Sequence, residues 1–209
     1  LCKTRPYFKT HAWKVFMKRL TYLFAVALSC VSCSVLAQDW LPVKGSTLTF
    51  SSSFQAEAFT GEFSRFTPQI RFNPKQLASS RFDVAIDLLS VNSKNSERDD
   101  TLKTADFFDT KKTPNARYTA TKFVSLGGNR YQANGMLSLR GLSKPVALIF
   151  TWTQSKGAVL SGDAVINRLD FNIGTGDWAD TELLPNAVKV HTRLILTPKP
   201  LTSPAPVAK

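Results

Sequence analysis

The sequence has 209 residues, a length that suits one domain with a core large enough to fold without a metal or a disulfide. The chain has 27 basic and 15 acidic residues, and six of the basic ones but no acidic ones lie in the first 37 positions. The rest of the chain therefore has 21 basic and 15 acidic residues. No basic run there is denser than Lys111–Lys112, which argues against nucleic-acid binding but is compatible with transient contact with a membrane surface. Because all three cysteines (Cys2, Cys30, Cys33) precede residue 38, the remaining chain has no disulfide and no thiolate chemistry.

Residues 1–37 have the pattern of a leader that ends in a signal peptide. A basic pair follows Met17, residues 20–28 are almost wholly apolar, and Val35 and Ala37 are the small residues that signal peptidase requires. We predict that translation starts at Met17, that cleavage follows Ala37, and that the protein is periplasmic or secreted. The apolar run is shorter than the roughly 20 residues that cross a bilayer, so a membrane anchor is the weaker interpretation.

Residues 38–197 read as one β domain, because short segments of alternating apolar and polar residues are separated by turn residues. In the clearest segment, Phe82, Val84, Ile86 and Leu88 point to one side and the residues between them to the other. The predicted turns are 73–74, 127–129, 143–145 and 156–157. The predicted strands are 47–54, 59–72, 81–89, 116–126, 131–140, 145–153, 158–168 and 188–196.

Two further segments differ from this pattern. Residues 95–108 predict a short helix over one barrel end, because Asn95 or Ser96 can cap it and acidic residues crowd its first turn. Residues 198–209 are Pro-rich and polar and are predicted to be a disordered tail. Eight strands with one apolar face form either a soluble barrel or a membrane barrel. Charged residues on the polar faces, together with the helix and the tail, favour the soluble all-β antiparallel barrel.

The residues predict no catalytic, metal or cofactor site. After residue 37 the only histidine is His191, which lies on a predicted polar face and is interpreted as a solvated strand residue. The acidic residues of 97–100 are explained by a helix N-terminus, and the glycines of 174–176 do not form a dinucleotide-binding loop. An enzyme would therefore need His191 and a carboxylate to meet in a cleft.

Apolar side chains, above all aromatic ones, are the outstanding feature of the predicted inward faces. A barrel of eight strands is either filled by its own side chains or holds one small ligand. Small residues on the same faces, such as Ala133 and Ala164, slightly favour a cavity. The predicted pore-lining residues are Phe50, Phe54, Phe72, Phe82, Val84, Ile86, Leu137, Leu139, Leu148, Phe150, Trp152 and Ile166.

Three stretches carry a family resemblance: RDDTLKTADFFDTKKTP at 98–114, NGMLSLRGLSKPVALIF at 134–150, and the stretch 166–196, which contains Arg168-Leu169-Asp170-Phe171. Together with the opening strand they resemble the YceI-like family of exported bacterial proteins. The resemblance implies a lipocalin-like barrel of eight strands, with an apolar pore for a polyisoprenoid or similar lipid, and no catalytic residues.

The sequence departs from the family pattern at Thr101, where members often have His, at Asn172, where Gly is frequent, and at Arg117-Tyr118, where Thr-Phe is common. The first departure argues against a shared metal or acid–base role, and the other two could alter the shape of the pore. We therefore expect an exported carrier of polyisoprenoid or fatty lipid chains. The alternative is an envelope or stress-response module whose barrel is packed and binds no ligand.

Overall fold

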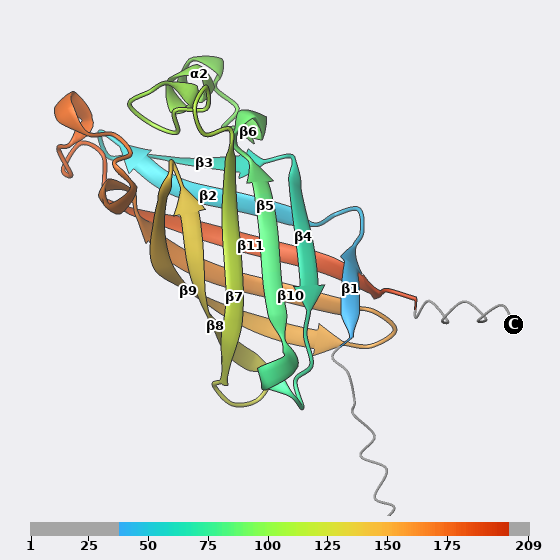
Figure 1. Cartoon of the computed structure of the whole chain (residues 1–209). Helices are drawn as coiled ribbons and strands as arrows, with labels where there is room; N and C mark the ends of the chain where they lie inside the picture. The colour runs from blue at the N-terminus through green and yellow to red at the C-terminus, as the bar shows by residue number, and fades with distance from the viewer. Residues whose placement is uncertain (1–37, 201–209) are drawn as a thin grey trace, which may run out of the picture. The chain divides into compact units, whose positions relative to one another are not determined.

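The computed structural model describes residues 38–200, so the predicted leader and most of the predicted tail lie outside the described residues. The described part consists of antiparallel strands arranged around one interior (Figure 1). In chain order the strands are β1 (Asp39–Pro42), β2 (Thr47–Phe54), β3 (Glu57–Phe63), β4 (Phe66–Arg71), β5 (Arg81–Asp87), β6 (Val91–Asn92), β7 (Asn115–Ser125), β8 (Arg130–Leu139), β9 (Leu142–Gln154), β10 (Ala158–Asn167) and β11 (Ala187–Pro198).

Eight of these strands close into a ring. Their order is β1-β4-β5-β7-β8-β9-β10-β11, and the ring is complete because β11 also pairs with β1. The hairpin of β2 and β3 extends from β11, and its free side meets the two-residue strand β6. The predicted fold class, an eight-stranded antiparallel barrel with one short helix, is confirmed.

The strand β1 was not predicted, and it is what closes the ring. It pairs with the end of β11 from Trp40↔Pro198 to Pro42↔Leu196, whereas β2 pairs with β11 from Lys189 to Arg193. The chain bends away between them, where Gly45 has φ +96°, a conformation that side chains with a Cβ rarely adopt. The strands β1 and β2 therefore lie one after the other along the same side of β11.

The predicted strand 59–72 is two strands, β3 and β4, separated at Ser64 and Arg65. The Ser64 N–H donates to the Ser90 carbonyl at 3.1 Å, and the Arg65 guanidinium bonds the Asp87 carboxylate at 2.8 Å. These contacts hold a corner at which the chain turns from the β2–β3 hairpin into the ring. The apolar positions change from odd numbers in β3 (Phe59, Phe63) to even numbers in β4 (Phe66, Ile70), and this change of phase was the sequence sign of the break that the prediction of one strand overlooked.

The predicted turn at 143–145 was also wrong, because those residues lie inside β9. The hairpin between β8 and β9 turns at Arg140 and Gly141, with φ values of +53° and +77°. Two consecutive residues with positive φ are typical of the tight turn that suits the twist of a β-hairpin. Pro145 is tolerated within the strand, where it pairs with Met136.

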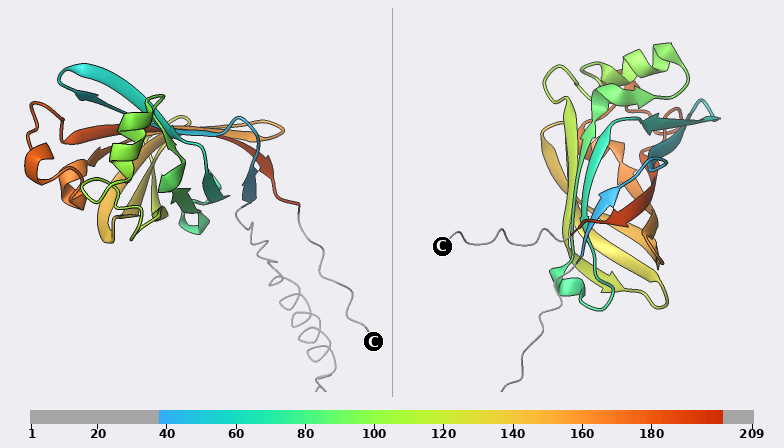
Figure 2. Two further views of the ribbon diagram at one scale, coloured as in Figure 1. Left: turned by 90° about the horizontal axis from the view of Figure 1, so that it is seen from above. Right: turned by 90° about the vertical axis from the view of Figure 1, so that its right-hand side faces the viewer.

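One end of the barrel is covered by two connections (Figures 1 and 2). The first contains the helix α2 (Ser96–Lys103), whose Asn95 side chain accepts a hydrogen bond from the Arg98 N–H at 3.0 Å. The predicted helix is thus confirmed with its Asn95 cap, but it ends at Lys103 instead of residue 108. The second contains the short helices η3 (Arg168–Phe171) and η4 (Gly176–Trp178). Within residues 38–200 no helix is long and apolar enough to cross a membrane.

Candidate ligand-binding site

The end of the barrel opposite α2 is filled by its own aromatic side chains. The ring of Phe72 lies at its centre, with ring centroids 4.8 Å from Trp152, 5.1 Å from Tyr131 and 5.3 Å from Phe150. The indole N–H of Trp40 donates to the Phe72 carbonyl at 3.2 Å. We call this cluster the aromatic plug; its members are Trp40, Phe72, Phe82, Phe123, Tyr131, Phe150 and Trp152.

The other half of the interior contains two apolar cavities, of about 100 Å³ and about 140 Å³. The first cavity begins at Phe82 of the aromatic plug, and the second ends beneath the residues of the two covering connections. The two cavities adjoin, because five residues line both: Leu48, Ile86, Leu137, Ile166 and Val190. The covering residues of the second cavity are Leu102, Phe107, Phe108, Arg168, Ile173 and Leu184.

The walls follow from strand periodicity. Alternate residues of β5 point inward, which places Phe82, Val84 and Ile86 on the cavity side while Asp83 and Ala85 point outward. On the hairpin, Phe50 pairs with Gly61, and a Cβ at Gly61 would overlap the Phe50 ring. The absence of that Cβ lets the ring lie against β3, which leaves the space beside it open.

Tyr118 brings one polar atom into the middle of the barrel. Its ring lines the first cavity, and its hydroxyl lies 3.1 Å from the Ala133 carbonyl and 3.2 Å from the Val146 carbonyl. Burial raises the pKa of the Tyr118 hydroxyl, so this group stays neutral and donates to the strand carbonyls. The hydroxyl thus ties the cavity wall at Tyr118 to two neighbouring strands.

The structure places eight of the predicted pore-lining residues on the cavity walls: Phe50, Phe82, Val84, Ile86, Leu137, Leu139, Leu148 and Ile166. Three others, Phe72, Phe150 and Trp152, face inward but lie within the aromatic plug, away from the lining of both cavities. Contrary to the prediction, these three residues do not line either cavity, because neighbouring aromatic rings surround each of them. Contact of the eight with a ligand stays a prediction.

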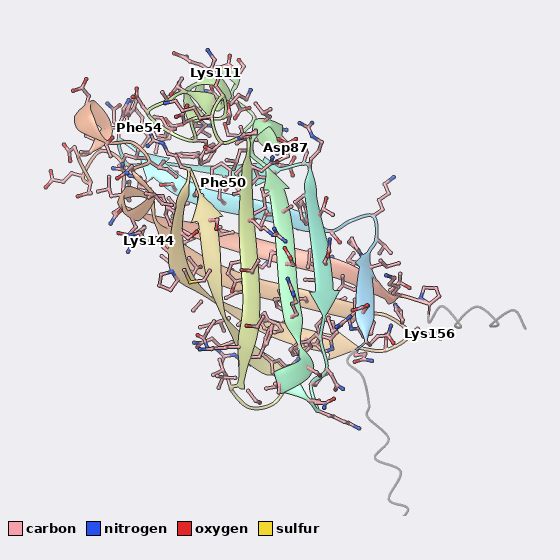
Figure 3. All side chains as sticks on the ribbon, in the orientation of Figure 1. Phe50, Phe54, Asp87, Lys111, Lys144 and Lys156 are labelled. Carbon is pink, nitrogen blue, oxygen red and sulfur yellow. The ribbon has the colours of Figure 1, made fainter. Side chains whose placement is uncertain are left out.

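Phe54 was predicted to line the pore and does not. It follows Phe50 by four residues on β2, but β2 pairs with β11 only as far as Ser51. Beyond that point the hairpin leaves the ring, so Phe54, which is labelled in Figure 3, is 37% exposed. The centroid of its ring lies 5.9 Å from that of Trp178. The alternation of a strand predicts which residues face the interior only where that strand is part of the barrel wall.

Arg168 is a residue whose role the sequence did not reveal, although it begins the third family motif. It is buried, and its guanidinium donates to the carbonyls of Leu184, Pro185, Ile173, Gly174 and Trp178. Burial lowers the pKa of Arg168, and the five carbonyl dipoles offset part of the cost of burying the charge. It holds the second covering connection in place over the cavity.

Arg98 and Asp99 have a related role in the first covering connection. The Arg98 guanidinium donates to the Ser93 hydroxyl at 2.9 Å and lies 4.4 Å from the centre of the Phe59 ring. The Asp99 carboxylate accepts from the Ser93 N–H at 2.8 Å. Both motif residues therefore fix the start of α2 against β6 and the hairpin.

His191 does meet a carboxylate, but outside any hollow. Its Nδ1 lies 2.7 Å from Oδ1 of Asp163, the residue opposite it on β10, and both side chains are exposed on the outer face of the barrel. Neither residue lines the two cavities. Within residues 38–200, no three His, Cys, Asp or Glu side chains converge as metal ligands would. The His191–Asp163 pair therefore lies apart from the apolar candidate site.

A closed antiparallel barrel with an apolar interior, capped at one end by a helix, defines a lipocalin-like binding fold. The chain belongs to the YceI-like domain family, whose model matches residues 41–196. A UPF0312 protein of Vibrio parahaemolyticus is 29% identical over 184 residues, which cover 80% of this chain and 97% of that protein.

Solved structures show the same fold. BcnA of Burkholderia cenocepacia has 28% sequence identity and a TM-score of 0.69, with 72% of this chain and 95% of BcnA covered. The YCEI protein of Campylobacter jejuni has 26% identity and a TM-score of 0.61, over 67% of this chain and 84% of that one. A polyisoprenoid-binding domain from Saccharophagus degradans has 19% identity and a TM-score of 0.60, over 78% and 99%.

Proposed function

We propose that this protein binds the hydrocarbon chain of a polyisoprenoid or similar lipid in the two adjoining cavities and carries it outside the cytoplasm, without acting as an enzyme. The observation that carries the proposal is the continuous apolar lining from Phe82 to the covering residues, which offers a hydrocarbon chain almost no polar group. A structural neighbour described as a polyisoprenoid-binding domain supports the same ligand class. Export is supported by the leader pattern of residues 1–37.

The energetics favour a chain-like apolar ligand. Each isoprene unit that leaves water for the cavity contributes roughly 3–4 kcal/mol, at about 0.8 kcal/mol per buried carbon. Association costs about 4–15 kcal/mol in lost translational and rotational freedom, and the burial of two or three isoprene units offsets most or all of this cost. A short tail should therefore bind weakly and a longer one tightly. A polar metabolite would gain nothing from the same walls.

The packed-barrel alternative accounts for only part of the interior. The aromatic plug is packed in the way that this alternative requires. The two cavities are not, although well-packed protein interiors hold few voids larger than a water molecule. The interior is better explained as a packed base that supports a binding chamber.

A substitution that fills the chamber tests the proposal. Leu137 lines both cavities, so Leu137→Trp puts an indole where the tail would lie, whereas Met136→Trp puts the same ring on the outer face of the same strand. With farnesol as the probe, we expect native mass spectrometry to show one bound molecule on the wild type and on Met136→Trp. Leu137→Trp should lose at least about tenfold in affinity while its far-UV spectrum stays that of the barrel.

Two results would contradict this proposal. One is a wild-type protein that, after removal of copurified lipid, takes up neither farnesol nor longer prenols. The other is equal binding by Leu137→Trp and Met136→Trp. Cell fractionation of a tagged full chain tests the export step separately, and retention of the uncleaved chain in the cytoplasm would refute it.

A further inference from the structure

The wall of the barrel has a seam where β2 and β11 separate. Their pairing runs from Thr47↔Arg193 to Lys189↔Ser51 and stops there, although β2 continues to Phe54 and β11 begins at Ala187. On its other side, β11 keeps its partner β10 as far as Asn167↔Ala187. The backbones of residues 52–54 and 187–188 therefore face each other without a ladder between them.

The second cavity lies on the inner side of this seam, and a groove lies on its outer side. Ser52 and Val188 line the cavity, while their neighbours Ser53 and Ala187 line the groove. Ser52 and Phe59, which are paired across the hairpin, line both hollows. Only the thickness of the separated strands thus divides the apolar chamber from solvent at this point.

Ser52 is polar where the chamber is apolar. Its hydroxyl oxygen is buried, and it has no hydrogen-bond partner among residues 38–200. Leaving a buried hydroxyl without a partner is unfavourable, and native structures rarely do so without a reason. A ligand atom at the seam, at the point where an apolar tail meets a polar group, would give this hydroxyl its partner.

The outer groove is chemically different from the chamber. It is lined by hydroxyl groups of Ser51, Ser53 and Thr60 and by the exposed ammonium group of Lys189, and no carboxylate lines it. Hydroxyl and ammonium donors together with one positive charge suit an anionic, acceptor-rich group such as a phosphate monoester. The acidic residues nearest to it along the chain are Glu57, Glu62 and Glu182, and none of the three lines the groove.

We propose that the seam between β2 and β11 is the portal of the chamber, and that the groove outside it binds the phosphate head group of a lipid whose tail lies inside. The tail passes between Ser52 and Val188, and Lys189 contacts the head group. This inference rests on the proposed function, because it assumes a tail in the cavities. It adds the point at which the ligand enters the chamber, and it adds that the head group of the ligand is negatively charged.

Farnesyl phosphate and farnesol test the inference, because they share one tail and differ in the head group. We expect the delipidated wild type to bind farnesyl phosphate about tenfold more tightly than farnesol, the gain from one charge-assisted contact. Titration calorimetry gives both affinities, and the readout is their ratio. A variant that weakens tail binding in general lowers both affinities equally and leaves this ratio unchanged. Lys189→Glu should bring the ratio to one or below, and Ser52→Ala should lower it.

The matched control is Lys156→Glu, an identical charge change in the exposed turn between β9 and β10 at the far end of the barrel (Figure 3). It should keep the wild-type ratio. Farnesol binding with no preference for the phosphate, or with a preference that Lys189→Glu leaves intact, overturns the portal inference alone. Binding of neither probe overturns the proposed function together with it.

Discussion

Single residues show how this barrel keeps a chamber open at one end. A cavity needs a cover that does not collapse into it, and Arg168 supplies the support from beneath the second covering connection. Its guanidinium reaches carbonyls on both sides of η4, from Ile173 to Pro185, and these contacts fix the course of that connection. A lysine could not do the same, because it lacks the planar array of five donors.

Replacing Arg168 by alanine should therefore destabilise the folded protein. Arg168→Ala leaves several buried carbonyls without a donor, and we expect the free energy of unfolding to fall by about 3 kcal/mol. Urea denaturation followed by circular dichroism measures the loss. Arg193→Ala, which removes an exposed arginine from β11, should change stability by less than about 0.5 kcal/mol. Equal effects of the two variants would show that Arg168 is no support for the cover.

Sequence reasoning could find the inward residues of β5 because alternation and burial are the same physical fact there. It could not separate Phe50 from Phe54, although both follow the same alternation on one strand. The difference depends on where β2 loses β11 as a partner, and pairing between residues some 140 positions apart leaves no local mark. The carbonyl partners of Arg168 were hidden for a different reason, because they lie in an irregular connection whose sequence has no period.

At the scale of elements, a charged contact joins β5 and β7 on the outer face of the wall. The Asp83 carboxylate accepts two hydrogen bonds from Arg117, from Nε to Oδ1 and from Nη2 to Oδ2, both at 2.7 Å. Arg81 adds a weaker contact at 3.3 Å. Hydrogen bonds from Arg117 lower the pKa of Asp83, although burial of the carboxylate opposes them.

This contact should make part of the stability depend on pH. Because the pKa of Asp83 is lower in the folded protein than its usual value of about 3.9, its contribution is fully present above that value and is lost as the pH falls through the folded pKa. We expect Arg117→Ala to lower the free energy of unfolding at pH 7, modestly because Arg117 is largely exposed, and to lower it much less in strong acid.

Urea denaturation of both proteins at several pH values checks this expectation. Arg130→Ala, at the exposed start of β8, is the control and should show no pH-dependent difference. A cost for Arg117→Ala that stays constant down to acidic pH would mean that the Asp83 contact does not stabilise the wall. The partner of Asp83 could not be foreseen, because the register of β5 against β7 follows from a connection of almost 30 residues.

At the scale of the whole molecule, the eight-stranded barrel was predictable from strand number and turn spacing, but its closure was not. The first predicted strand, β2, leaves the ring, and the short segment β1 takes its place between β4 and β11. A four-residue strand that ends at Pro42 carries too little alternation to be recognised. The same rearrangement leaves β2 free to diverge from β11 and so creates the seam.

The division of the interior was also beyond prediction, because the residues of both the plug and the chamber are apolar and occupy inward positions of the strands. Aromatic rings fill one end because Ala120, Ala133 and Ala158 leave room for them there. Toward the covered end the walls are built mainly from Leu, Ile and Val, which do not meet across the barrel. The depth available to a ligand is therefore set by the position of the plug.

That depth should appear in the dependence of affinity on chain length. For prenols of two to five isoprene units, we expect the dissociation constant to fall by about tenfold or more per unit while the tail still enters the cavities. The gain per unit should then shrink at the length at which the tail meets Phe82 of the plug.

Phe123→Ala removes a ring 4.8 Å from that of Phe82 and should move this limit to a longer prenol. Phe54→Ala, an identical change outside the cavities, should leave the limit in place. Titration of the three proteins with the same series decides the matter, and equal gains at every length in all three would refute a plug that limits the chamber.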